Sequence, residues 1–76
     1  MPNVLAIRIE ETLRPVIGTV LATVSVDVET KRIGKNPETV DRSDLVHIAD
    51  NLVLALRLVV GQDMAEAAAR RVLDLA

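Results

Sequence analysis

The sequence contains no cysteine and no aromatic residue. Without cysteine, neither a disulfide nor a thiolate zinc site can supplement the fold. Without aromatic rings, the chain offers neither a stacking platform for unpaired bases nor an aromatic cage for a cationic ligand. Long apolar runs are also missing: the longest, Leu52–Leu56, is far too short to span a bilayer, and no segment has the pattern of a signal peptide. We therefore expect a cytoplasmic protein that makes no membrane contact.

Aliphatic side chains, in contrast, are abundant, since 50% of the 76 residues are hydrophobic. A chain of this length forms one domain, residues 1–76, and buries a small fraction of its surface. Its stability must come from very apolar packing or from association with another chain. The formal net charge of −2 gives no general attraction to nucleic acid or to anionic lipid.

The second half of the chain has clear helix boundaries. Gly34 is placed to end a first helix in the left-handed conformation, with two basic residues in the last turn and Pro37 shortly after. A second helix is predicted over residues 44–60, where an apolar pattern of helical period runs up to Gly61. A third, alanine-rich helix is predicted over residues 63–75.

The first half permits two interpretations. Apolar residues from Leu5 to Val28 recur at spacings of three and four, which indicates a helix. The valines at positions 24, 26 and 28 also alternate with polar residues, as in a half-buried strand. Because the helical pattern is longer and ends at Gly34, we predict an all-α fold, a small bundle of three to four helices. The alternative is an α+β fold in which an N-terminal β-hairpin packs on two helices.

Pro15 determines how the first segment continues. The preceding residues, Thr12–Arg14, include none of the Gly, Asn or Asp residues that favour a tight turn, whereas a proline within a helix is tolerated as a kink. We therefore predict one long helix over residues 3–33, kinked at Pro15, or two helices nearly in line. A helix of this extent would reach on the order of 45 Å. The two later helices could not cover its whole apolar face, so part of that face would need a second molecule, or the chain would have to fold back at Pro15.

A leucine in a polar stripe gives a second reason to expect a partner. The polar residues of helix 44–60 fall on one side of the helix: Asp44, His47, Asp50, Asn51 and Arg57. Leu54 lies in the middle of this stripe, where a monomer gains nothing from it. The candidate interface is therefore Leu5, Ile9, Leu13 and Leu54, and the expected partner is a second copy, in a homodimer, or another protein.

A group of basic residues near the centre of the chain suggests a different function. Lys31, Arg32, Lys35 and Arg42 could meet phosphates, which would make the chain a small regulator that binds nucleic acid. Acidic residues interleave with these four, and the last helix lacks the polar side chains that a DNA-reading helix needs. Nucleic-acid binding is therefore the weaker alternative.

The single histidine is the other chemical candidate. His47 has Asp44 and Asp50 three residues away on either side, but no second histidine or cysteine completes a metal site. As a phosphoacceptor it would resemble the histidine of a phosphotransfer helix, although Ile48–Asp50 replace the small and basic residues that usually follow. A histidine phosphotransfer-like domain is thus a further alternative, and a surface histidine is the simpler interpretation.

No Ser–His–acid arrangement, paired carboxylates or glycine-rich phosphate loop occurs at a convincing spacing. We expect no enzymatic activity, cofactor or metal. The sequence predicts a non-catalytic helical protein–protein interaction module, self-associating, with an assembly or regulatory role.

Overall fold

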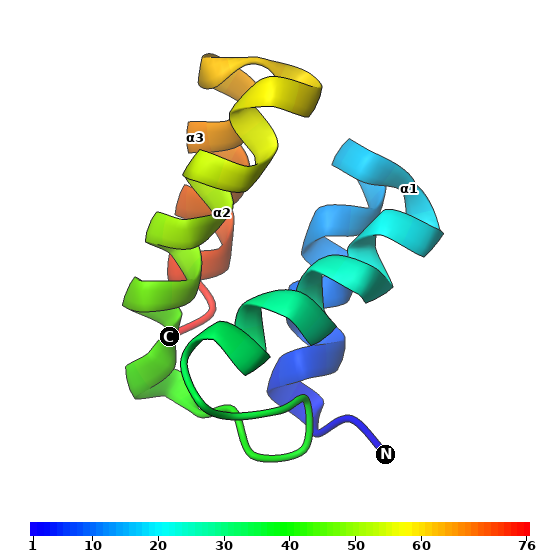
Figure 1. The fold of residues 1–76 in the computed structure, drawn as a ribbon, viewed down its shortest axis with the longest axis vertical. Helices are drawn as coiled ribbons and strands as arrows, with labels where there is room; N and C mark the ends of the chain where they lie inside the picture. The colour runs from blue at the N-terminus through cyan, green and yellow to red at the C-terminus, as the bar shows by residue number, and fades with distance from the viewer.

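The chain folds into two helical hairpins joined by a loop, as a computed structural model of residues 1–76 shows (Figure 1). The elements are α1 (Val4–Arg32), a short 3₁₀ helix η1 (Arg42–Asp44), α2 (Leu45–Val60) and α3 (Gln62–Leu73). The structure contains no strand, so the predicted all-α bundle is confirmed and the alternative with a β-hairpin is wrong. None of the helices combines the length and the hydropathy that a bilayer crossing requires.

Helix α1 is itself a hairpin, because its backbone leaves the helical conformation at Gly18, with φ 81° and ψ 168°. Its two arms, residues 4–17 and 19–32, run back along each other (Figure 1). Across them the Thr23 hydroxyl donates a hydrogen bond to the Glu10 carboxylate at 2.8 Å. The longest dimension of the molecule is 29 Å, whereas a straight helix of this many residues would span roughly 44 Å.

The predicted position of the break, Pro15, is therefore wrong by three residues, and the nearly in-line course predicted for this segment is wrong as well. Pro15 lies inside the helical backbone of the first arm, and its ring is exposed. The chain reverses at Gly18 because a φ near +80° with an extended ψ is open essentially to glycine alone. This reversal, and not a second molecule, covers the inner face of the first arm.

The second hairpin turns in the same way. Gly61, between α2 and α3, has φ 88° and ψ 163°, nearly the values of Gly18. Its N–H donates to the Arg57 carbonyl at 3.1 Å, and its carbonyl accepts from the Ala65 N–H at 3.0 Å. One glycine thus ends one helix and begins the next, and both turns lie at the same end of the molecule (Figure 1).

The core lies between the two hairpins and is built from residues three or four apart on each helix. Small alanines on α3 let it approach α2 closely. The buried core cluster consists of Ala6, Ile9, Leu13, Ala22, Val26, Val40, Leu45, Ile48, Leu52, Leu56, Ala65, Ala68 and Val72.

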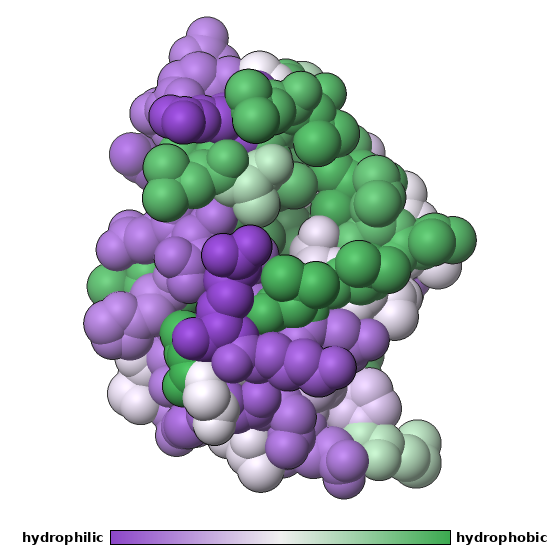
Figure 2. Space-filling view, in the orientation of Figure 1, coloured by the Kyte–Doolittle hydropathy of each residue, from purple (hydrophilic) through white to green (hydrophobic).

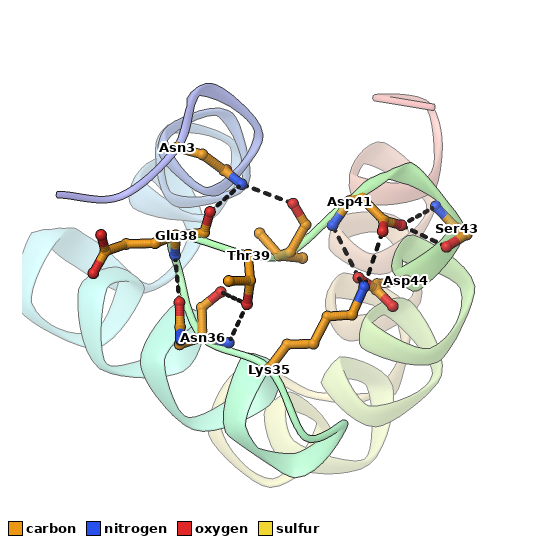
Figure 3. Close-up of polar contacts among 9 residues, drawn as sticks. Asn3, Lys35, Asn36, Glu38, Thr39, Asp41, Ser43 and Asp44 are labelled. Carbon is orange, nitrogen blue, oxygen red and sulfur yellow. Dashed lines mark hydrogen bonds and ion pairs between the residues drawn. The ribbon is translucent and has the colours of Figure 1, made fainter.

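The loop that joins the hairpins is held by polar contacts to the start of the chain (Figure 3). Asn3 caps α1 by accepting from the Ala6 N–H at 2.8 Å, and its amide donates to the carbonyls of Val40 at 2.7 Å and Glu38 at 3.3 Å. Gly34 ends α1 as predicted, with φ 76°, while the Lys35 N–H closes on the Thr30 carbonyl at 2.9 Å. The Asn3 side chain therefore fixes both the start of α1 and the loop between the hairpins.

Candidate interaction surface

The second arm of α1 has two apolar faces. Ala22 and Val26 point into the core, and Val20, Leu21, Val24 and Val28 are exposed on the other side of the helix. We call these four exposed residues the outer stripe. At 3.6 residues per turn they lie within an arc of about 100°, nearly opposite the buried residues. A helix that buries one face usually presents polar side chains on the other, so the outer stripe is an unusual solvent surface.

The outer stripe also explains the strand-like alternation of valines in this segment. Val24 and Val28 belong to the exposed face, and Val26, between them in sequence, belongs to the buried face. The segment is apolar on two sides of a helix, which gives the same alternation as one side of a strand. The alternation of valines therefore reflects two apolar faces of one helix and does not indicate a sheet.

The C-terminal part of α2 adds exposed side chains near the same end of the molecule. Leu54 is exposed as predicted, at 59%, and Leu58 is the most exposed residue of the helix among large hydrophobics, at 88%. Val59 is exposed as well. Figure 2 shows apolar surface gathered over this part of α2 and along α1 on one face, whereas the opposite end of that face is mostly hydrophilic.

These side chains are well exposed in the single chain. The outer stripe and residues 54, 58 and 59 keep between 40% and 88% of their accessible surface. Exposed apolar side chains that gather on one part of a monomer often mark a protein–protein interaction site.

Three of the four residues predicted for an interface lie elsewhere. Ile9 and Leu13 are fully buried in the core, and Leu5 is half-buried against it. The prediction was wrong for Ile9 and Leu13 because the chain reverses at Gly18 and covers this face with its own helices. Only Leu54 is freely exposed.

Two of the four residues of the predicted basic patch are paired with acidic residues of the same chain. The Lys35 ammonium pairs with Asp44 at 2.8 Å and Asp41 at 2.9 Å, and the Arg32 guanidinium lies 3.3 Å from Glu29. The other two predicted members, Lys31 and Arg42, are exposed and form no ion pair. Arg42 lies apart from the pairs, beside Arg8 at a hollow of about 240 Å³. The four predicted residues therefore do not form one group of free positive charges.

Lys35, Asp41 and Asp44 form the tightest polar cluster in the molecule (Figure 3). Asp41 and Asp44 make a reciprocal capping box at η1: the Asp41 carboxylate accepts from the Ser43 N–H, and the Asp44 carboxylate accepts from the Asp41 N–H, both at 2.9 Å. Hydrogen bonds from Ser43 and then from Lys35 lower the pKa of Asp41 to about 2. Hydrogen bonds to Asp44 and Asp41 raise the pKa of Lys35 above its ordinary value. The two carboxylates share the Lys35 ammonium and also accept backbone N–H groups, so the cluster is a structural brace for the loop.

His47 is exposed on α2, where it was expected to lie. Asp44 is held by the capping box and by Lys35, which leaves it engaged away from the imidazole. No group of three or more His, Cys, Asp or Glu residues is arranged to hold a metal ion.

Glu29 is the residue that sequence reasoning missed. Its side chain is only 3% exposed, and although Arg32 lies 3.3 Å from Oε1, that oxygen accepts no hydrogen bond. Burial raises the pKa of Glu29 above its ordinary value, and the nearby Arg32 charge opposes this shift. The signal in the sequence was present but weak, since position 29 continues the inner-face spacing of Ala22 and Val26.

Comparison of the chain with protein-family models, with curated proteins and with solved structures finds no match. The surface of the molecule is therefore the basis for its proposed function.

Proposed function

We propose that this chain is a non-catalytic helical interaction module that self-associates and serves in the assembly or regulation of larger complexes. The observation that carries the proposal is the outer stripe of α1, an apolar helix face directed away from the core. Transfer of such a surface from water into a protein contact is favourable at roughly 25 cal/mol per Å². A second molecule can supply this contact.

The reason for self-association differs from the one the sequence suggested. The inner face of the first arm is covered by the fold, and the total accessible surface of 4610 Å² is ordinary for a chain of 8.2 kDa. The unusual property is the composition of the surface on the outer stripe and the end of α2, and not its total amount.

The mass of the protein in solution tests the proposal. Light scattering should be recorded from micromolar to millimolar concentrations, with detection by refractive index because the chain has no Trp or Tyr. We expect a mass of two chains or more that declines on dilution. A mass of 8.2 kDa at every concentration would contradict self-association.

A further inference from the structure

We propose that two copies of the chain pack through their outer stripes, with the second arms of α1 crossing antiparallel at a two-fold axis beside Val24. This inference rests on the proposed self-association and assigns it a surface and a register. The axis would place Val20 of one copy against Val28 of the partner subunit.

The spacing of the valines supports a second copy as the occupant. Val20, Val24 and Val28 form a ridge with steps of four residues, and this ridge is unchanged when its direction is reversed about Val24. A two-fold interface requires that the same patch be complementary to itself, which a symmetric ridge satisfies. Ridges of this step also interdigitate in the commonest mode of helix packing.

The charges beside the outer stripe permit this register. Between positions 20 and 28 the only charged residue is Asp27, at the border of the stripe. The two Asp27 side chains would lie on opposite sides of the axis, on the order of 9 Å apart along the helix direction. No like charges meet directly at the crossing, and at about one Debye length the repulsion between the two carboxylates is weak.

The residue type and the exposure favour an interface as well. Val has a stiff side chain and loses little rotamer freedom when it is buried by a partner. Val24 itself is 47% exposed in the single chain, so it has surface to bury. The exposed residues at the end of α2 adjoin the Gly61 turn, which lies at the same end of the molecule as the Gly18 turn.

A matched pair of substitutions tests the surface. Val24→Asp introduces a carboxylate at the axis, and Val46→Asp introduces one at an exposed valine of α2 outside the proposed interface. We expect Val24→Asp to raise the dissociation constant by about tenfold or more, because two carboxylates would be buried unpaired in each dimer. Val46→Asp should dissociate like wild type, and far-ultraviolet circular dichroism should show that both variants are folded.

The absence of cysteine allows a direct test of the register. A residue beside a two-fold axis meets its own copy, so Val24→Cys should form a disulfide-linked dimer under mild oxidation. A mixture of Val20→Cys and Val28→Cys should cross-link more efficiently than either variant alone. Val46→Cys serves as the control for random collision.

The outcomes separate the two proposals. If wild type is monomeric at all concentrations, both self-association and this interface are wrong. If wild type is dimeric but Val24→Asp dissociates no more readily than Val46→Asp, self-association stands and the outer stripe is not its interface. If Val24→Cys cross-links no faster than Val46→Cys, the two-fold axis beside Val24 is wrong.

Discussion

At the scale of single residues, Glu29 is the clearest conflict between a side chain and its surroundings. Its carboxylate is removed from water without a hydrogen bond to Oε1, and its ion pair with Arg32 compensates only partly. Because the pKa is raised in the folded state, the charged form disfavours folding. The stability of the protein should therefore fall as pH rises from about 4.5 through the folded pKa of Glu29.

We predict that Glu29→Met raises the free energy of unfolding by about 1 kcal/mol at pH 7, since an apolar side chain of similar length replaces a buried carboxylate. Arg32 is 60% exposed and remains solvated when its partner is removed. Urea unfolding followed by circular dichroism measures the change. Glu11→Met, at an exposed position of the same helix, should change stability by less than about 0.5 kcal/mol. A destabilised Glu29→Met would show that the carboxylate is favourable where it lies.

The pair of Lys35 with Asp41 predicts the behaviour of the loop at extreme pH. The lowered pKa of Asp41 contributes stability that is present above its ordinary value of 3.8 and lost as pH falls toward about 2. The raised pKa of Lys35 contributes stability that is present below its ordinary value of 10.5 and lost as pH rises above it. Lys35→Met should therefore lose less stability than wild type as pH falls from 3.8 toward about 2, and again as pH rises above 10.5.

Thermal unfolding of wild type and Lys35→Met at pH 2, 7 and 11 checks this prediction. The difference in melting temperature between the two proteins should be largest at pH 7 and smaller at pH 2 and pH 11. A difference that stays the same at all three values would mean that Lys35 and Asp41 are not coupled in solution.

At the scale of the elements, two glycines determine the topology. Gly18 and Gly61 share a conformation with positive φ and extended ψ, and a Cβ added at either would find no atom within 4 Å. Substitution by alanine is therefore opposed by the backbone conformation alone. We predict that Gly18→Ala and Gly61→Ala each lower stability by about 1–3 kcal/mol in urea unfolding.

A chain of 76 residues can be assembled synthetically, which offers a control with reversed chirality. D-Alanine at position 18 should be tolerated, because a positive φ with an extended ψ is a favourable region for a D-residue. L-alanine and D-alanine add the same atoms. Equal losses for both would assign the effect to the added methyl group and contradict the backbone argument.

These turns also show which features of the fold the sequence could reveal. Gly34 and Gly61 were predicted because the apolar pattern stops at each of them. Gly18 was missed because the apolar spacing continues past it, and Pro15 is nominally the stronger helix breaker. The two turns nevertheless share a local pattern, since Val16–Thr19 and Val59–Gln62 each have two aliphatic β-branched residues followed by a glycine and a polar residue.

The exposed apolar surface could also be predicted only in part from the sequence. Leu54 could be identified because it interrupts a polar stripe, so one helix was enough to show the anomaly. The outer stripe could not be separated from the core face of α1 without knowing where the chain reverses. Because residues 4–17 and 19–32 form two separate arms, the valines at positions 20, 24 and 28 lie outside the core.

At the scale of the whole molecule, the two hairpins place their glycine turns at one end and the braced loop at the other (Figure 1). The exposed apolar side chains of α1 and α2 include residues next to both turns, Val20 and Val59 among them. The polar cluster of Lys35, Asp41 and Asp44 lies in the loop at the far end (Figure 3). The molecule is therefore polarised, with a braced polar end and an apolar face beside the turns.

Self-association at that face should couple stability to protein concentration. If dimers form only from folded chains, mass action raises the melting temperature with concentration, by about 3–6 °C for each tenfold increase in a dimer of this size. Thermal unfolding followed by circular dichroism over a hundredfold range of concentration measures the slope. Val46→Asp should retain it, and Val24→Asp should show a smaller slope because a larger fraction of it unfolds from the monomer. A wild-type melting temperature independent of concentration would place the apolar face in contact with water alone, and the stability of the fold would then come entirely from the core between the two hairpins.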